Sequence, residues 1–375
     1  MDRTALVIGA GIGGLAAAGH LHRNGWEVEV RERAPALPAT GTALSLWPGA
    51  LRALDLLGLG ATVRDLARAQ SRGVFLRSDG HRIATVDLDG LRRRTGDPVY
   101  LLSRPALLRT LAAPLFGSGV LRFGEAVTPA VQDRTGHAPV GASGDASDDT
   151  SRHDVVIVAD GLHSRFRTAL FGEAHRPRHA GVTCWRGAVD GDTDTFTETW
   201  GHAARFGVTP QEQGRTNWFA CARAPERATA RGGDLAALHA CFGHWHPGVR
   251  HVLDRLDETG GAGLLRHDLY DLAVPLPRYV RGRTALIGDA AHAMTPDLGR
   301  GACEAIVDGV TLARELTSRT RVEDALAAYD AQRRRPTQRL ARTARLMRRS
   351  VHTPGAAPLR NSATRLAVAL GRPPA

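Results

Sequence analysis

Apolar and polar residues near the amino terminus follow an order that predicts a β-α-β unit. An apolar strand is expected at 4–8, the sequence GAGIGG follows at 9–14, and a helix then runs to about Asn24, with Gly25 as its stop. The stretch WEVEVRER alternates apolar and polar residues, which predicts a second strand ending at Glu32. Such glycines let the backbone approach a pyrophosphate, and an acid at this spacing holds a ribose. The combination predicts a dinucleotide site.

The sequence TALIGDAAHAMTPDLGRG predicts a second ligand-binding turn. Asp289 follows a short apolar strand, where open α/β sheets bind ligands, and its carboxylate can accept hydrogen bonds from sugar hydroxyls. Pro296 stiffens the loop, while Gly299 and Gly301 let a flat ligand approach the backbone. The helix expected at 302–316 directs free N–H groups and partial positive charge toward the turn. An ordinary strand–turn–helix is the alternative for this stretch taken alone.

The segments between these two patterns predict further elements of an α/β protein. An amphipathic helix is expected from about Pro48, and Ser103 is placed to begin another helix that has Pro105 in its first turn. Strands are expected at 71–89 and from 154 to the pair Asp160-Gly161, with a polar surface loop at 133–153.

Between about 177 and 271 the sequence changes to short strand-like pieces that carry most of the tryptophans, with one helical stretch, LAALHACFGHW. We therefore expect a β-rich second lobe inserted into the nucleotide-binding domain. The tripeptide His244-Trp245-His246 could suggest a metal site. No further ligands stand at suitable spacing, so a structural role is favoured and no metal is expected.

Length and composition fit a large soluble globular protein. The chain has 375 residues, 43% of them apolar, and no apolar run long enough to span a membrane, so stable membrane insertion is not expected. The apolar stretch after Arg3 is explained by strand, turn and helix better than by a signal peptide. The four cysteines form no CxxC pair, which favours reduced thiols in a cytoplasmic protein; they are Cys184, Cys221, Cys241 and Cys303.

The net charge of +11 is carried by arginine alone, which is typical of a GC-rich genome and says little about function. The densest basic run lies at 332–350 and could suggest nucleic-acid binding. It lacks interleaved aromatic residues and matches no nucleic-acid-binding motif. A solvated helical face is therefore favoured, and no nucleic-acid partner is expected.

Three motifs in order carry a family resemblance: the glycines at 9–14, the pair Asp160-Gly161, and Gly288-Asp289 with the Pro and Gly turn that follows. Over roughly 4–345 the chain resembles the single-component FAD-dependent monooxygenases of the p-hydroxybenzoate hydroxylase fold. The stretches ALSLWPGALRALDLLGLG, CWRGAV, ETWGHAARFG and GDAAHAMTPDLGRGACEA are most similar to the branch of salicylate hydroxylases, FAD-dependent urate hydroxylases and zeaxanthin epoxidases.

The resemblance implies a set of residues that bind FAD without a covalent link, since no Cys or His is marked as an attachment point. The pyrophosphate would be cradled by Gly9, Gly11, Gly13 and Gly14. The adenosine end would contact Glu32, Arg33 and Val127. Ser45 and Arg104 would lie against the flavin side, and Asp160-Gly161 would serve FAD phosphate and transient NAD(P)H binding. Gly288 and Asp289 would hold FAD hydroxyls, and Pro296 would belong to the same cofactor site. The isoalloxazine ring would lie over Gly299, Arg300, Gly301, Ala302 and Cys303.

Three positions depart from the usual family pattern. Asp297 and Arg300 replace an Asn and a Gln of the turn, and Val158 replaces a frequent Gly. The substitutions in the turn could alter the environment or mobility of the ring.

The implied fold class is α/β: a Rossmann-like FAD-binding domain (GR2-type) with an inserted β-rich substrate domain and C-terminal helices. The FAD-binding domain would comprise 1–70, 97–176 and 272–345, the substrate domain 71–96 and 177–271, and a C-terminal helical tail 346–375.

The implied activity is NAD(P)H-dependent hydroxylation of an aromatic or heteroaromatic small molecule by O₂ through a flavin C4a-hydroperoxide. Epoxidation of an alkene, or FAD binding without oxygenation, are the alternatives. Arg205, in ARFG, is the candidate catalytic residue, for anchoring substrate or gating turnover, against the alternative of a surface or inter-strand arginine. Arg186 and Trp218 are weaker candidates. The substrate, the choice of NADH or NADPH, and the oligomeric state are left open.

Overall fold

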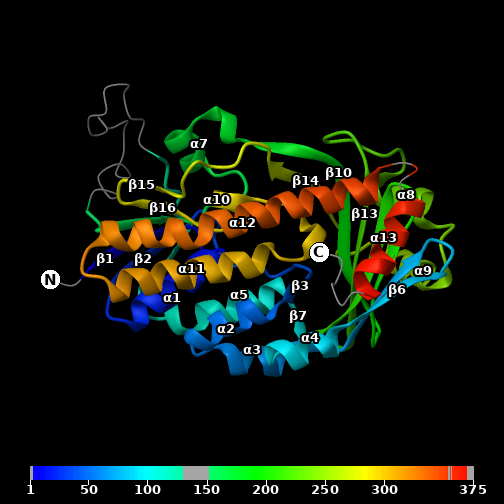
Figure 1. Ribbon diagram of the computed structural model, residues 1–375, viewed down its shortest axis with the longest axis horizontal. Helices are drawn as coiled ribbons and strands as arrows, with labels where there is room; N and C mark the ends of the chain where they lie inside the picture. The colour runs from blue at the N-terminus through cyan, green and yellow to red at the C-terminus, as the bar shows by residue number, and fades with distance from the viewer. Residues whose placement is uncertain (1–2, 130–151, 354, 356, 370–375) are drawn as a thin grey trace.

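The computed structural model describes residues 3–129, 152–353, 355 and 357–369, which form three sheets with surrounding helices (Figure 1). The half built on the mainly parallel sheet lies at one end and a β-rich half at the other. The long helix α12 (Val322–His352) runs from one half to the other.

The first sheet is mainly parallel, and its central strands β9 and β1 are largely buried apolar runs, whereas β2 alternates. Strand β1 pairs in parallel with β2 on one side and with β9 on the other, and β16 pairs in parallel with β9. Because parallel strands end at one edge, the glycine turn, Glu32, Asp160 and Asp289 all lie at that edge. In spatial order the strands are β15 (Val280–Arg281), β16 (Thr284–Leu286), β9 (Val155–Val158), β1 (Thr4–Ile8), β2 (Glu27–Glu32) and β8 (Leu121–Phe123).

Helices α1 and α11 pack closely against one another beside this sheet, with α12 next to α11 (Figure 1). Gly309 permits the close approach, because a Cβ there would lie 2.4 Å from the carbonyl oxygen of Gly13. The helices of this half are α1 (Ile12–Arg23), α2 (Pro48–Leu56), α3 (Gly60–Leu66), α5 (Arg104–Ala112), α7 (Arg165–Phe171), α10 (Asp289–His292) and α11 (Gly301–Ser318).

The second sheet is antiparallel except where β11 pairs in parallel with β5. This pairing joins the hairpin of β5 and β6, at 72–87, to β11, which begins more than a hundred residues later in the sequence. Helices α8 (Gly233–Phe242) and α9 (Pro247–Glu258) share a buried aromatic core with the sheet, in which the Phe242 ring lies 5.4 Å from that of Phe206. In spatial order the strands are β14 (Leu265–Leu272), β10 (Pro177–Asp190), β13 (Arg215–Arg223), β12 (Ala204–Gln211), β11 (Phe196–Trp200), β5 (Arg72–Arg77) and β6 (Arg82–Asp87).

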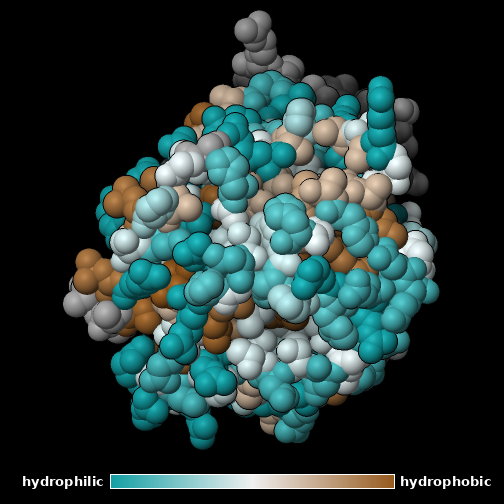
Figure 2. All heavy atoms as spheres, turned by 90° about the vertical axis from the view of Figure 1, so that its right-hand side faces the viewer, coloured by the Kyte–Doolittle hydropathy of each residue, from teal (hydrophilic) through white to brown (hydrophobic). Residues whose placement is uncertain are grey.

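Shorter elements complete the described chain. The C-terminal helix α13 exposes Leu359 and Leu366, and this end of the molecule is mostly hydrophilic with scattered hydrophobic side chains between (Figure 2). The remaining strands and α-helices are the third sheet, formed by β3 (Ala43–Leu46), β7 (Val99–Ser103) and β4 (Arg68–Gln70), and the helices α4 (Leu88–Thr95) and α13 (Ala357–Ala369).

The predicted fold class and the predicted β-α-β unit are confirmed. Ser103 begins its helix as expected, since its Oγ accepts a hydrogen bond from the Ala106 N–H at 3.3 Å. Helix α12 continues unbroken across the expected boundary at 345/346. The surface loop expected at 133–153 lies almost wholly outside the described residues. None of the described helices is both long and apolar enough to cross a membrane.

The expectation of a solvated helical face at 332–350 is correct only in part. The segment is helical, but Arg333 reaches two buried acids, with its Nε 2.6 Å from Asp308 and its Nη2 2.5 Å from Glu304. Arg345 likewise pairs with the buried Asp271 at 2.7 Å. These arginines neutralise acids of the interior, and sequence patterning cannot distinguish them from solvated neighbours.

Candidate functional site

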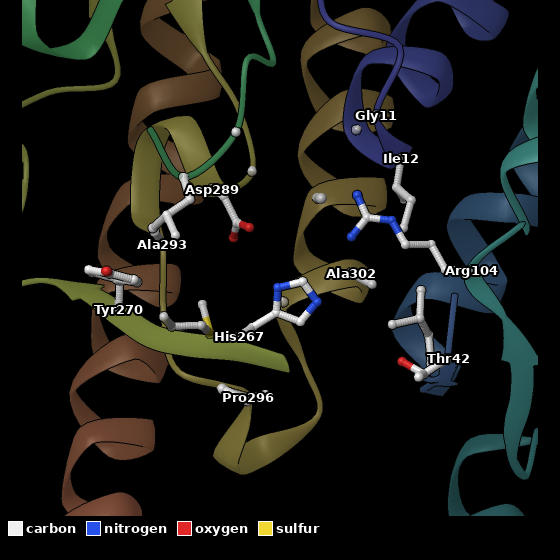
Figure 3. Close-up of a pocket in the computed structure, with 18 of the residues that line it drawn as sticks. Gly11, Ile12, Thr42, Arg104, His267, Tyr270, Asp289, Ala293, Pro296 and Ala302 are labelled. Atoms are coloured by element: carbon white, nitrogen blue, oxygen red, sulfur yellow. The ribbon is translucent and has the colours of Figure 1, made fainter. Parts of the chain in front are cut away.

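A cavity of about 1120 Å³ lies between the carboxyl edge of the parallel sheet and one face of the β-rich sheet (Figure 3). Arg104 and Asp289 point into it from different elements, with His267 of β14 between them. It also contains most residues that sequence analysis assigned to FAD: Gly9, Gly11, Gly13, Glu32, Arg33, Ser45, Arg104, Val127, Asp160, Gly161, Gly288, Asp289, Pro296, Gly299, Arg300, Gly301 and Ala302. Arg205 lines the same cavity, whereas Gly14 and Cys303 do not.

The glycines at the cavity are required for two different physical reasons. Gly9 has φ +105°, and a Cβ on Gly14 would lie 2.1 Å from the Gly9 carbonyl oxygen, so both are required by the protein's own packing. By contrast, a Cβ on Gly11 would meet protein only at 3.9 Å, and one on Gly301 would meet no protein atom within 4 Å. Both of these glycines line the cavity, where a Cβ would take up space. Their absent side chains therefore fit a ligand that approaches the backbone.

Glu32 is held by the turn that it adjoins. Its Oε2 accepts a hydrogen bond from the Ala10 N–H and its Oε1 accepts one from the Ala34 N–H, each at 2.9 Å. These bonds fix the carboxylate at the rim of the cavity, with further lone pairs able to accept from a ribose hydroxyl.

Two further acids face the cavity and lack full partners. Asp160 Oδ1 is buried and accepts no hydrogen bond from the described residues, and burial raises the pKa of this carboxyl. Asp289 opens onto the cavity. Burial by the surrounding protein raises the pKa of this carboxyl, and the positive charges of His292 and Arg104 only partly offset that rise. Hydroxyl donors of a ligand would satisfy both carboxylates.

The loop before α11 shapes the other end of the cavity. Gly299 has φ +60°, and a Cβ on it would lie 3.4 Å from Ser45 Oγ. Arg300 pairs with Glu304 at 2.9 Å and lies over the Trp47 ring at 5.4 Å. The Cys303 thiol donates to the Ser45 carbonyl oxygen at 3.1 Å, away from the cavity. Burial raises the pKa of Cys303 to about 11, so it stays protonated.

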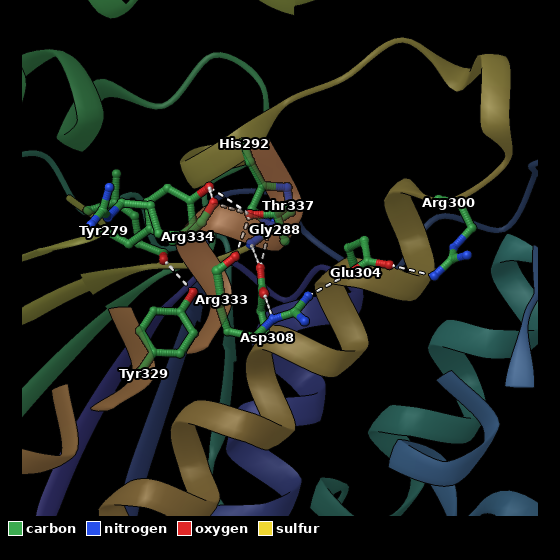
Figure 4. Close-up of polar contacts among 11 residues, drawn as sticks. Tyr279, Gly288, His292, Arg300, Glu304, Asp308, Tyr329, Arg333, Arg334 and Thr337 are labelled. Atoms are coloured by element: carbon green, nitrogen blue, oxygen red, sulfur yellow. Dashed lines mark hydrogen bonds and ion pairs between the residues drawn. The ribbon is translucent and has the colours of Figure 1, made fainter. Parts of the chain in front are cut away.

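A buried charge network behind this loop was missed by sequence analysis (Figure 4). Asp308 accepts hydrogen bonds from the Gly288 N–H at 2.9 Å and from Arg333 Nε at 2.6 Å, and lies 2.5 Å from His292 Nε2. Burial alone would raise the pKa of Asp308, but His292 and Arg333 lower it overall. The network thereby fixes Gly288, whose neighbour Asp289 faces the cavity. The sequence signal that could have revealed this network was an acid, Asp308, within the apolar stripe of the helix predicted at 302–316.

Arg205 is buried, with only 2% of its surface exposed, which excludes a surface arginine. Its Nη1 lies 3.1 Å from Glu198 Oε1 and its Nη2 3.1 Å from Asp297 Oδ1. Burial opposes the charge of Arg205, but the two carboxylates outweigh that effect and hold its pKa well above its usual range. Its guanidinium also lies 5.3 Å from the centre of the Phe219 ring.

The wall opposite the FAD motifs carries an aromatic surface. The Phe219 ring of β13 covers Gly207 of β12, because a Cβ on Gly207 would lie 2.1 Å from Phe219 Cε1. Phe219 lines the cavity and is only partly buried. The glycine therefore leaves room for a ring that a flat ligand can contact.

The tripeptide His244-Trp245-His246 has structural contacts. Trp245 is buried in the core beneath the β-rich sheet, and His246 Nε2 lies 2.8 Å from Thr199 Oγ1. Nowhere in the described chain does a group of three His, Cys, Asp or Glu side chains form a candidate metal site.

The parallel sheet, the glycine turn and the acids around one cavity are the features of a dinucleotide-binding domain. The FAD binding domain family model matches residues 2–232 and 272–344, and the chain belongs to this family. The family match agrees with the FAD cofactor that sequence analysis predicted, and the FAD-binding role of the individual residues stays a prediction.

Curated relatives agree with this assignment. The chain is 33% identical to an FAD-dependent urate hydroxylase of Klebsiella pneumoniae over 88% of this chain and 85% of the relative. It is 35% identical to a 3-amino-4-hydroxybenzoate 2-monooxygenase of Streptomyces cremeus over 93% of this chain and 87% of the relative. The crystal structure of Klebsiella pneumoniae HpxO complexed with FAD and uric acid matches with a TM-score of 0.83 and 30% identity, covering 98% of this chain and 92% of that one. The chain is thus an FAD-dependent monooxygenase, and the predicted family, cofactor and enzyme class are confirmed.

Proposed function

We propose that this enzyme hydroxylates an aromatic or heteroaromatic small molecule, with NAD(P)H as transient reductant and O₂ as oxidant. The observation that carries the proposal is one cavity that is lined both by the residues assigned to FAD and by the partly exposed Phe219 ring. A flat substrate between that ring and the flavin would place its reacting carbon against the cofactor. The relatives named for urate and for 3-amino-4-hydroxybenzoate act on ring compounds, which supports this substrate class.

Each part of the site has a distinct task in this proposal. Glu32 and Asp289 bind FAD hydroxyls, and the loop from Pro296 to Gly299 supports the ring. The amino terminus of α11 favours negative charge on the ring. When bound, FAD supplies acceptance of hydride and activation of O₂.

Arg205 acts in this proposal by positioning. Its ion pair with Asp297 holds the β-rich wall against the loop under the ring. This contact fixes the gap in which substrate and flavin meet, and such alignment governs whether oxygen reaches the substrate.

The proposal also assigns segments of the chain to the substrate wall and to the FAD site. Strands from 71–96 and 177–271 supply the substrate wall, and the remaining described segments up to 345 supply the FAD site. Free thiols at all four cysteines support a cytoplasmic setting.

The test is oxidation of NADH and NADPH by FAD-loaded protein against a panel of phenols, aminobenzoates and purines under oxygen-18 gas. We expect at least one ring compound to gain one labelled oxygen on a ring carbon. Epoxidised alkene as the only labelled product, or hydrogen peroxide as the only product with every ring compound, would contradict the proposal.

A further inference from the structure

Two of the arginines through which the β-rich sheet lines the cavity, Arg205 and Arg186, differ in their partners. Arg205 is neutralised by Glu198 and Asp297. Arg186 lines the same cavity, and its buried Nε has no hydrogen-bond partner. Within the part of the chain that the structure describes, no carboxylate lies within ion-pair distance of Arg186. Arg186 is partly buried and lines the cavity without a counter-charge from the described residues, so it is available to pair with an anionic ligand.

Strand geometry places Arg186 beside the aromatic wall. Arg186 stands directly opposite Phe219 in the register of β10 and β13, so both side chains project from the same face of the sheet. Cys184, two positions earlier on β10, also lines the cavity, as strand alternation requires. A ring lying on Phe219 would therefore have the Arg186 guanidinium at its edge.

The positive charge of Arg186 lowers the pKa values of two other residues that line the cavity, His267 and Arg104. Burial lowers the pKa of His267, and the positive charges of Arg186 and Arg104 lower it further. Burial lowers the pKa of Arg104, and the positive charge of Arg186 lowers it further. The negative charge of Asp289 raises it in part. The two arginines thus act on a common space, in which His267 is kept neutral and an anion is favoured.

We propose that Arg186 binds a fixed anionic group, a carboxylate on the substrate's aromatic ring, while the ring packs on Phe219. This inference rests on the proposed aromatic hydroxylation and specifies its substrate class. A guanidinium matches a carboxylate with two parallel hydrogen bonds, which a neutral amide cannot reproduce. Arg186 is a substrate-binding residue in this assignment, distinct from the positioning role of Arg205.

The experiment compares binding of hydroxybenzoates and aminohydroxybenzoates with binding of the corresponding benzamides, which have the same shape without the charge. Binding to the FAD-loaded protein is followed by the change in flavin absorbance without reductant, so no turnover is required. The variants are Arg186→Gln and Arg186→Lys. The control is Arg178→Gln, which removes the same charge from the same strand at an exposed position outside the cavity.

We expect wild type and Arg178→Gln to prefer a benzoate over its benzamide by about ten- to hundredfold, and Arg186→Gln to lose that preference. Arg186→Lys is expected to keep part of it, and all variants to keep wild-type FAD affinity.

Three results would overturn the proposal. The first is equal binding of benzoates and benzamides by wild type, and the second is binding of neither class. The third is a benzoate preference that survives in Arg186→Gln while FAD affinity falls. That third result would assign Arg186 to the cofactor. The proposed hydroxylation is judged separately, by labelled product. A preserved benzoate preference without any hydroxylated product would refute the hydroxylation and leave the anion site standing.

Discussion

Arg205 Nη2 lies 3.1 Å from Asp297 Oδ1, and this ion pair joins the β-rich sheet to the loop that precedes α11. Both side chains are almost fully buried. Sequence analysis identified Asp297 as a departure from the Asn of the family pattern, and the carboxylate makes this contact an ion pair. The pair links two halves of the site that are built from distant parts of the sequence.

We expect Arg205→Ala to reduce coupling more than FAD affinity. It should also lower the free energy of unfolding by about 3–5 kcal/mol, because Asp297 and Glu198 are left buried without their counter-charge. The measurements are the ratio of hydroxylated product to NAD(P)H consumed, FAD titration and denaturant unfolding. Arg205→Gln combined with Asp297→Asn is the matched variant, since it removes both charges of the pair and should recover part of the stability. An unchanged product ratio in a folded Arg205→Ala protein would remove Arg205 from the site.

Asp289→Ala should weaken FAD binding. A hydrogen bond to a charged group contributes about 1.5–3 kcal/mol, which corresponds to roughly ten- to hundredfold in the dissociation constant. Flavin fluorescence titration of the apoprotein measures this change. Asp190→Ala removes an exposed carboxylate outside the cavity and serves as the control. Equal FAD affinity of Asp289→Ala and wild type would refute the assignment of this acid.

FAD affinity should fall on acidification, beginning above the ordinary titration range of an aspartic acid. The surrounding protein raises the pKa of Asp289 in the free protein, and FAD hydroxyls favour the ionised carboxylate. Below the raised pKa the acid must lose a proton before FAD binds, so affinity decreases as the pH falls. The measurement is the FAD dissociation constant as a function of pH. Asp289→Asn, which cannot ionise, should lose this component, and an identical pH profile in both proteins would contradict the prediction.

Gly207→Ala should weaken substrate binding while leaving FAD binding intact. The added Cβ would lie 2.1 Å from Phe219 Cε1, so the ring must move toward the space that the substrate occupies. Michaelis constants and FAD titration separate the two effects. Gly207→Ala combined with Phe219→Leu removes the clash and serves as the control for backbone strain. Unchanged substrate affinity of Gly207→Ala would show that the Phe219 ring does not form the wall of the site.

The sequence by itself determined the β-α-β unit, the cap at Ser103 and the motifs that identify the family. These features depend on residues close together in the chain: apolar periodicity sets the strands, and a glycine without a Cβ sets the turn. Glu32 and Asp289 could be placed for the same reason, since each ends a recognisable strand and all parallel strands end at one edge.

Only the tertiary structure decided which charges are paired. Asp308 and Arg333 were individually visible as an acid in an apolar stripe and one arginine of many, but their contact depends on how α11 packs against α12. Likewise, Arg205 and Arg186 are both strand arginines in the sequence. Arg205 pairs with Glu198 on the neighbouring strand β11 and with Asp297 of the loop before α11, whereas Arg186 has no carboxylate partner among the described residues. Charge pairing arises from contacts between distant segments, and local sequence patterns carry no information about those contacts.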